Sequence, residues 1–379
     1  MRMISTARDK QWMSRAVALA ERGRLTTSPN PMVGACIVKN NRLIAEGYHA
    51  EYGGEHAEAM ALRKAGRRAR GAVLYVTLEP CSTWGKTPPC DQAVKKSGIR
   101  RVIIGTLDPN PKHHAKGLAH LKKQGIAVSH GLFADEIQRQ NEAFFKLMKT
   151  GLPFVTLKMA QTLDGKIAAR NGSSRWITSA PARNLVHHLR REHDAVLVGK
   201  NTLMQDDPRL WTNLPPVKGR ADKPWRIVID SQGKISSTAR VFSGNQWTLV
   251  AVSEKKSSKG IAGRIASGKN MSILFLPEKN GKLDLKELLK QIACLGVMRL
   301  LVEGGGELAW SLFNEKLVDR AYWMVAPKVL GGRASKTSVE GDGFVRLSDA
   351  VLGEFEQSFS VGPDWVFVTR FSSGHGNKK

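Results

Sequence analysis

The chain has 379 residues, a length that favours two domains over one. Its 41% hydrophobic and 24% charged residues exclude a disordered protein, and without a run of about 20 apolar residues or an apolar leader we expect a cytoplasmic protein with no membrane partner. The net charge of +26 alone favours a polyanion, but the basic residues are scattered, so we expect a small anionic substrate, such as a phosphate ester, and no nucleic acid.

The first 150 residues alternate the periodicities of helices and strands. Residues 8–23 have the 3.6-residue period of an amphipathic helix, and Gly23 is placed to end it. The other patterns predict a mixed sheet covered by helices. The predicted elements are two strands within 32–49 joined at an Asn-Asn turn, helix 55–64, strand 72–78, helix 90–97, strand 100–106, helix 115–125, a further strand, and helix 134–151.

A domain boundary is predicted near residue 150. Gly151 ends a helix, Pro153 prevents its continuation, and a new strand begins. We therefore place one domain at 1–149, a second at 150–372 and a disordered tail at 373–379. The second domain has strands at 154–159, 194–199, 226–230, 247–252, 298–303, 319–326 and 364–370, and helices at 179–192, 284–294 and 306–314.

A metal site is predicted from three separated residues of the first domain. His56 stands at the start of a predicted helix, Cys81 follows Glu79-Pro80 after a strand, and Cys90 follows two prolines at the start of another helix. One imidazole and two thiolates are a common ligand set for catalytic zinc, which leaves a fourth position for water. We therefore predict one Zn²⁺ per chain.

Glu58 is the predicted catalytic residue, because it lies two positions after His56. Zinc brings the pKa of bound water down to about 7, and a carboxylate nearby can pass the released proton to a departing amine. This arrangement resembles the cytidine-deaminase superfamily. Eight residues separate the two cysteines where the usual signature has two, and the longer loop can hold substrate-contacting groups such as Lys86 and Thr87.

Plainer interpretations stay open at this stage. A lone His-x-Glu on a helix is usually part of a solvated face, and two nearby cysteines are often buried thiols. Asn30, between two prolines, either reads the edge of a pyrimidine or forms a simple turn, and His49 is either a substrate contact or a loop histidine. The turn Gly304-Gly305-Gly306 favours a phosphate at a helix start, but a strand-to-helix turn also requires glycine.

The two halves together resemble the bifunctional riboflavin-biosynthesis deaminase/reductase family. The motifs that carry the resemblance span about residues 8 to 371. In the first half they are PNPMVGACIV, GYHAEYGGEHAE and TLEPCSTWGKTPPC; in the second they are KMAQTLDGKIA, SRWITS, AVLVGKNTLMQDDPRL, RIVID and LVEGGGELAWSLF. The resemblance implies an α/β protein with an N-terminal cytidine-deaminase-like three-layer domain and a C-terminal dihydrofolate-reductase-like domain.

The resemblance also implies the chemistry. A zinc-dependent hydrolase would deaminate 2,5-diamino-6-ribosylamino-4(3H)-pyrimidinone 5′-phosphate, and an NADPH-dependent oxidoreductase would then reduce the ribosyl group of 5-amino-6-(5-phosphoribosylamino)uracil to ribityl. The implied cofactor-binding residues are Ala160, Trp176, Thr202, Asp206, Ser231, Gly305, Gly306 and Glu307. The implied substrate-binding residues of the reductase are Ser174, Arg190, Leu210 and Glu303, with Arg209 as a substitute for an arginine that the family carries where this chain has Asn213.

Two rival functions remain at this stage. One is a deaminase of RNA or DNA bases with a fused accessory domain, which predicts tight, salt-sensitive binding of single strands. The other is a zinc-stabilised phosphate-binding module without catalysis, which predicts that Glu58→Gln changes nothing. Family members are often oligomers, so the resemblance also implies a possible homo-oligomer.

Overall fold

The computed structural model describes residues 6–84, 89–220, 224–255 and 270–371, and the predicted tail 373–379 lies outside them. The chain divides into two compact units, Met1–Gly151 with Val217–Arg220 and Leu152–Pro216 with Ala221–Lys379. The helix before the division ends at Gly151, whose φ of 70° suits a residue without a side chain. Within the described ranges, the helices are too short or too polar to span a bilayer.

The first unit is built on a five-stranded sheet with the order β2-β1-β3-β4-β5. β1 is antiparallel to β2 and β3, while β3, β4 and β5 are parallel. Its elements are α1 (Ala7–Ala20), β1 (Gly34–Lys39), β2 (Arg42–Tyr48), α2 (Ala57–Ala65), β3 (Val73–Leu78), α3 (Cys90–Lys96), β4 (Arg101–Thr106), α4 (Lys116–Lys123), β5 (Ala127–His130), α5 (Ala134–Gln140) and α6 (Glu142–Thr150).

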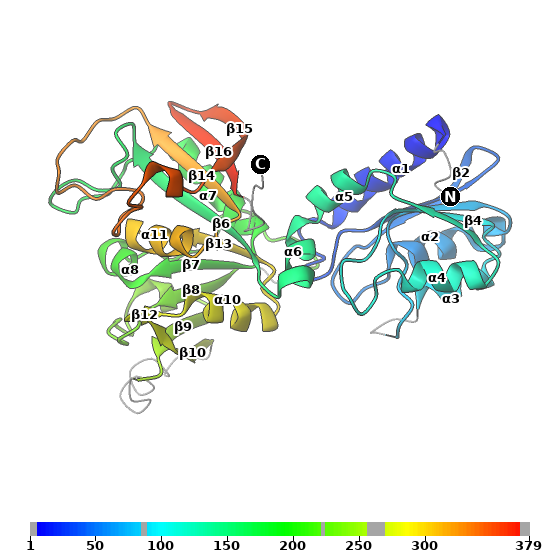
Figure 1. Cartoon of the computed structure of the whole chain (residues 1–379), viewed down its shortest axis with the longest axis horizontal. Helices are drawn as coiled ribbons and strands as arrows, with labels where there is room; N and C mark the ends of the chain where they lie inside the picture. Colours follow the sequence, from blue (N-terminus) through cyan, green and yellow to red (C-terminus); the bar gives the residue numbers. More distant parts are fainter. Residues whose placement is uncertain (1–5, 85–88, 221–223, 256–269, 372–379) are drawn as a thin grey trace. The chain divides into compact units, whose positions relative to one another are not determined.

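Helices cover both faces of this sheet. α1 and α5 lie on one face and α2, α3 and α4 on the other, as Figure 1 shows. Met13 of α1 and Ile137 of α5 join Cys36, Tyr75 and other strand side chains in one buried cluster. The unit is therefore the three-layer α/β fold that the sequence predicts.

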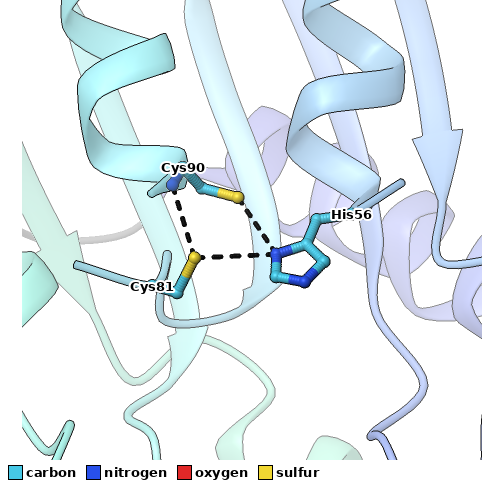
Figure 2. Close-up of side chains that lie close together, drawn as sticks. All are labelled: His56, Cys81 and Cys90. Carbon is cyan, nitrogen blue, oxygen red and sulfur yellow. Dashed lines mark hydrogen bonds between the residues drawn. The ribbon is translucent and has the colours of Figure 1, made fainter. Parts of the chain in front are cut away.

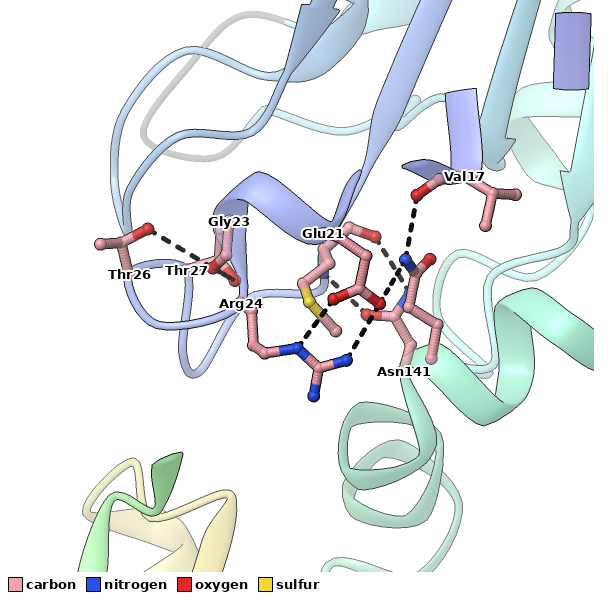
Figure 3. Close-up of polar contacts among 9 residues, drawn as sticks. Val17, Glu21, Gly23, Arg24, Thr26, Thr27 and Asn141 are labelled. Atoms are coloured by element: carbon pink, nitrogen blue, oxygen red, sulfur yellow. Dashed lines mark hydrogen bonds and ion pairs between the residues drawn. The ribbon is translucent and has the colours of Figure 1, made fainter. Parts of the chain in front are cut away.

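The prediction of a single helix over 134–151 is wrong, because Asn141 separates α5 from α6. The Asn141 backbone leaves the helical region, with φ −108° and ψ 24°. Its side chain accepts the Met32 N–H at 2.8 Å and donates to the Met32 carbonyl at 3.0 Å. Asn141 lies beside Glu21, which pairs with Arg24 at 2.7 Å (Figure 3). Asn141 thus fixes the segment that leads from Asn30 into β1.

The second unit has a nine-stranded sheet with the order β10-β9-β8-β7-β13-β6-β14-β16-β15, and a separate two-stranded hairpin β11-β12. Its strands are β6 (Phe154–Thr162), β7 (Ala195–Gly199), β8 (Trp225–Ile229), β9 (Thr248–Ser253), β10 (Met271–Leu276), β11 (Glu278–Lys279), β12 (Lys282–Leu283), β13 (Arg299–Glu303), β14 (Arg320–Ala326), β15 (Gly353–Val361) and β16 (Asp364–Phe371). Its helices are α7 (Ala180–Glu192), α8 (Lys200–Asp206), α10 (Leu285–Cys294) and α11 (Gly306–Asn314).

Seven neighbouring strands of this sheet, from β10 to β14, are parallel. Buried side chains of α10 and α11 pack on one face, and those of α7 and α8 on the other. Because parallel strands end at the same edge, the segments after β6, β7, β8 and β13 meet there. That edge is where an open α/β sheet binds ligands.

Candidate active sites

Three potential metal ligands of the first unit converge on one point. His56 immediately precedes α2, Cys81 follows the end of β3, and Cys90 is the first residue of α3. His56 Nδ1 lies 3.2 Å from Cys90 Sγ and 3.6 Å from Cys81 Sγ (Figure 2). The donor atoms all lie within 4.8 Å of one another. The fold thus brings together residues that are far apart in the sequence.

This donor set fits zinc. Ligand bonds of about 2.0–2.3 Å in a tetrahedral site place neighbouring donor atoms roughly 3.3–3.8 Å apart, close to the observed separations. The thiol and backbone N–H of Cys90 hydrogen-bond Cys81, and they lower the pKa of the Cys81 thiol. One sulfur is therefore held ready as the thiolate that a metal requires.

Glu58 occupies the first turn of α2 and is 4% exposed. Burial raises the pKa of this carboxyl to about 7, although the nearby His56 opposes the shift. A carboxyl group with a pKa near neutrality can both take up and give back a proton. Ala57, between the two polar residues, is fully buried and contributes packing alone.

Asn30 and His49 form one hydrogen-bonded pair next to these ligands. The Asn30 amide nitrogen donates to His49 Nε2 at 3.1 Å, and His49 Nδ1 donates to the Glu55 carbonyl at 3.0 Å. The His49 and His56 rings meet edge to face with centroids 5.5 Å apart. Burial lowers the pKa of His49, which favours the neutral ring; with Nδ1 donating to the Glu55 carbonyl, Nε2 is then the acceptor of the Asn30 amide N–H.

Glu79 organises the segment after β4, a role that sequence reasoning missed. Its carboxylate accepts the N–H groups of Asp108 at 3.1 Å, Ala115 at 3.0 Å and Leu118 at 3.0 Å. Because Cys81 follows two residues later, these bonds also anchor the turn that carries Cys81. The predicted substrate contacts Lys86 and Thr87 lie outside the described residues.

The second unit has a cleft of about 1400 Å³ at the carboxyl edge of its sheet. The residues predicted for the second half line this cleft, with one exception. They are Ala160, Ser174, Trp176, Arg190, Thr202, Asp206, Arg209, Leu210, Ser231, Glu303, Gly305 and Glu307. The exception is Gly306, where an added Cβ would lie 2.4 Å from the Thr337 carbonyl oxygen, so this glycine permits close packing rather than lining the cleft.

A largely buried ionic group lies within the cleft. The Arg190 guanidinium forms two hydrogen bonds to Glu303, at 2.6 and 2.8 Å, and donates to the Trp211 carbonyl at 2.8 Å. Lys158 Nζ lies 3.9 Å from Glu303, and burial lowers the pKa of this lysine. Sequence reasoning missed Lys158. The pattern that could have identified it is a lone cation within a predicted strand of mostly apolar residues.

The segment 174–176 closes another side of the cleft. Ser174 Oγ donates to Asp206 at 2.7 Å, and the Arg175 guanidinium donates to the Asp206 carbonyl. Trp176 is 62% exposed and lies under the Arg183 guanidinium, 4.3 Å from its ring centroid. An exposed aromatic face of this kind can pack against a planar ligand ring.

Arg209 and Asn213 are placed differently. Arg209 lines the cleft, with its guanidinium 5.4 Å from the Trp211 ring centroid. Asn213 is not among the lining residues, and its N–H lies 3.4 Å from His187 Nδ1. An anionic group in the cleft is therefore accessible to Arg209 rather than to Asn213.

Two family models match the chain, one in each half. Residues 6–106 match the cytidine and deoxycytidylate deaminase zinc-binding region, and residues 153–367 match the RibD C-terminal domain. The second model alone covers more than half of the chain.

Similar proteins are known from several bacteria. The riboflavin biosynthesis protein RibD of Aquifex aeolicus is 42% identical over 85% of this chain and 88% of its own, and that of Escherichia coli is 40% identical over 94% and 97%. A solved structure of Acinetobacter baumannii RibD has a TM-score of 0.85 at 33% identity, covering 96% of this chain and 99% of that one. A Thermotoga maritima structure, described as a diaminohydroxyphosphoribosylaminopyrimidine deaminase/5-amino-6-(5-phosphoribosylamino)uracil reductase, has a TM-score of 0.81 at 33% identity, covering 96% and 98%.

Proposed function

The chain belongs to the RibD family and is a bifunctional deaminase and reductase of riboflavin biosynthesis, and we propose that its two units divide the two reactions between them. The deaminase domain is residues 1–149 and the reductase domain is residues 150–372. The observation that carries this proposal is the coexistence of a His-Cys-Cys group in one unit and a large polar cleft in the other.

The substrates follow from the activities named for the Thermotoga maritima relative. The deaminase takes 2,5-diamino-6-ribosylamino-4(3H)-pyrimidinone 5′-phosphate, consumes water and releases ammonia. The reductase takes the resulting 5-amino-6-(5-phosphoribosylamino)uracil and, with a hydride and a proton, opens its ribosyl ring to a ribityl chain. Both substrates are small phosphorylated pyrimidines, which agrees with the positive charge of the chain.

In the deaminase, His56, Cys81 and Cys90 hold one zinc ion per chain. When bound, zinc supplies the Lewis acidity that makes hydroxide available near neutral pH. Glu58 takes up the proton released from water and delivers it to the departing amino group. Asn30 and His49 bind the pyrimidine, and Lys86 and Thr87 bind the rest of the substrate. The short hydrogen-bond chain from Glu55 through His49 orients the Asn30 amide.

Replacing Cys90 with serine is expected to reduce the zinc content from about one ion per chain to almost none, because serine is a poor zinc ligand at neutral pH. Ammonia release should disappear, while reduction of the deaminated intermediate continues. Metal analysis of the purified protein and the two separate activity assays measure these effects. Cys294→Ser is the matched control, since Cys294 is an exposed thiol outside the cluster. Full zinc content in Cys90→Ser would contradict the assignment.

In the reductase, the cleft binds NADPH, which supplies the hydride when bound. The cleft suits a dinucleotide because of the turn before α11. Gly305 caps this helix without a side chain, so the first N–H groups of the helix are open to a phosphate. The cofactor-binding residues are Ala160, Trp176, Thr202, Asp206, Ser231, Gly305 and Glu307, while Gly306 packs behind the turn. Most of the rate should come from holding the nicotinamide against the sugar carbon.

The substrate of the reductase lies beside the Arg190–Glu303 pair. Ser174, Arg190, Leu210 and Glu303 contact it, and Arg209 binds its phosphate in place of the residue at 213. The doubly hydrogen-bonded Arg190 is held rigidly by Glu303, so it presents its remaining surface to the substrate in one orientation. Lys158, buried at the same place, can position the sugar or supply a proton to it.

We also infer a homo-oligomer. β15 forms one edge of the nine-stranded sheet, and Phe355 (75% exposed) and Trp365 (51% exposed) lie on the β15-β16 hairpin with Phe367 between their rings. An apolar surface on an open sheet edge favours association with a second copy of the chain.

Changing both Phe355 and Trp365 to glutamate is expected to lower the molar mass in solution to that of a smaller assembly, because the charges would be buried in the interface. Light scattering coupled to gel filtration measures the mass. Leu295→Glu, at a similarly exposed position after α10, should leave the mass unchanged. A wild-type chain that is monomeric at micromolar concentration would contradict the inference.

A further inference from the structure

Two basic clusters of the sequence meet at one edge of the first sheet. Residues 63–70 (RKAGRRAR) precede β3, and residues 96–101 (KSGIRR) lead into β4. Because β3 and β4 are parallel, both clusters lie at the edge where these strands begin. The Gly71 N–H donates to the Gly98 carbonyl at 2.8 Å and ties the two segments together. Cations that are scattered along the sequence are therefore gathered by the fold.

The turn between β1 and β2 adds further cations to the same edge. β1 is antiparallel to β3, with Val38 opposite Val73, so Lys39 and Arg42 lie where β3 begins. Lys39 Nζ donates to the Arg70 carbonyl at 2.9 Å. α4 also ends here, with two lysines in its last turn, because β5 runs parallel to β4. We define the basic edge by six exposed side chains, Lys39, Arg42, Arg67, Arg70, Lys96 and Arg100.

Acidic residues are absent from this edge of the sheet. Between residues 59 and 134 the sequence contains three, Glu79, Asp91 and Asp108. All three lie at the opposite edge: Glu79 directly follows β3, Asp91 is in the first turn of α3, and Asp108 follows β4. Within the described ranges, no carboxylate forms an ion pair with the six side chains of the basic edge. Their positive charge is therefore not neutralised by the fold.

Helix ends alone do not explain the basic edge. Basic side chains commonly lie near the C-termini of helices, where they interact favourably with the helix dipole. This preference accounts for Arg67, just after α2, and for Lys96, the last residue of α3. Lys39 and Arg42 instead flank a turn between strands, and Arg100 directly precedes β4. The positive charge thus follows the edge of the sheet rather than any one helix.

The chemistry of the basic edge favours a nucleic-acid duplex among the polyanions. Four of its six cations are arginines, whose planar forks match phosphate oxygens. Binding to a membrane surface or stacking on unpaired bases also requires exposed apolar or aromatic side chains. In the described part of the first unit, the large exposed hydrophobic residues are Tyr52 and Trp84, which follow β2 and β3 at the opposite edge. A duplex can be bound through its phosphates alone.

We propose that the basic edge binds the phosphate backbone of a nucleic-acid duplex without reading its sequence. This interaction goes beyond the two reactions. β3, whose six residues span about 20 Å, separates the basic edge from Cys81 and the other candidate metal ligands. A bound duplex is consequently not a substrate of the deaminase. RNA and DNA duplexes share the phosphate chemistry on which this binding depends.

Direct titration of the full-length, zinc-replete protein tests the proposal. Fluorescence anisotropy of labelled duplexes of about 20 base pairs, one of RNA and one of DNA, reports binding. With about five phosphates contacted, the affinity should fall about 500-fold between 50 and 200 mM salt. The duplex that binds more tightly identifies the source of the phosphates, and either result supports the proposal.

Charge reversal tests whether binding occurs at the basic edge. Arg67→Glu, Arg70→Glu and Arg100→Glu combined should weaken duplex binding by at least about 100-fold and reduce the salt slope by about three. Lysine at the same three positions should retain most of the affinity, because the charge is kept. An unchanged zinc content and an unchanged rate of ammonia release would show that the glutamate variant is folded.

A control variant separates the basic edge from the total charge of the chain. Lys234→Glu, Lys316→Glu and Arg333→Glu combined change the net charge by the same amount at exposed positions of the second unit, and should alter duplex affinity by no more than about threefold. An equal loss in the control would overturn the proposal. So would an absence of duplex binding at 50 mM salt, or tighter binding of single strands or of phosphatidylglycerol vesicles than of either duplex.

Discussion

Glu58→Gln is expected to lower the rate of ammonia release by about 100- to 10,000-fold, because glutamine fills the same space but cannot carry a proton. The side chain is buried in the first turn of α2, two residues after His56. The amide should therefore leave the metal ligands in place. Reduction of separately supplied deaminated intermediate should continue at the wild-type rate, since the reductase cleft lies wholly in the other unit.

Two measurements make this result specific to proton transfer. Glu58→Gln should retain about one zinc ion per chain, which distinguishes a lost proton carrier from a lost metal. Glu46→Gln is the matched control, because Glu46 is a carboxylate of the same unit whose partner is Arg15 on the surface. Ammonia release by Glu58→Gln at a rate within threefold of the wild type would show that another group moves the proton.

Glu303→Gln is expected to abolish reduction and to destabilise the second unit by about 2–3 kcal/mol, because it leaves Arg190 and Lys158 as largely buried cations without a counter-charge. Ammonia release should persist. Tryptophan fluorescence during denaturant unfolding measures the stability, and NADPH oxidation measures the reductase. Glu356→Gln removes the partner of Arg320 and Arg370 at a more exposed site, and it should cost about 1 kcal/mol or less.

The stabilisation by Glu303 also predicts a pH dependence. Burial opposes ionisation of Glu303, but Arg190 outweighs burial, so the pKa of this carboxyl is lowered from its ordinary 4.5. The folded state consequently binds fewer protons than the unfolded state below about pH 4.5. The stability difference between wild type and Glu303→Gln should be complete above that pH and should shrink as the pH falls further. An unchanged difference at lower pH would show that the charge of Glu303 is not the cause.

The three candidate metal ligands and Glu58 could be singled out from the sequence because each stands at a predicted element boundary. Strand ends and helix starts are the positions where a sheet brings distant segments together, so the boundary signals at Cys81 and Cys90 were enough to expect proximity to His56. The hydrogen bond between Asn30 and His49 needed the structure, because it depends on Asn141 holding the segment at Met32 from over 100 residues away.

Other features of the structure could not be predicted from the sequence, for identifiable physical reasons. β15 has a register shift between Phe355 and Gln357, which breaks the two-residue alternation that marks a strand. The role of Lys158 could not be predicted, because its neighbour Glu303 lies 145 positions later in the chain and only the sheet brings the two together. The charge of +26 likewise gave no hint of which cations would line the cleft.

The central claim is that one chain performs two successive reactions at separate sites. Its most direct test incubates zinc-replete protein with 2,5-diamino-6-ribosylamino-4(3H)-pyrimidinone 5′-phosphate, first without NADPH and then with it. We predict that ammonia is released in the first stage, without NADPH. In the second stage, the added NADPH should be oxidised as the deaminated product is reduced. Absence of both ammonia release and NADPH oxidation would contradict the account.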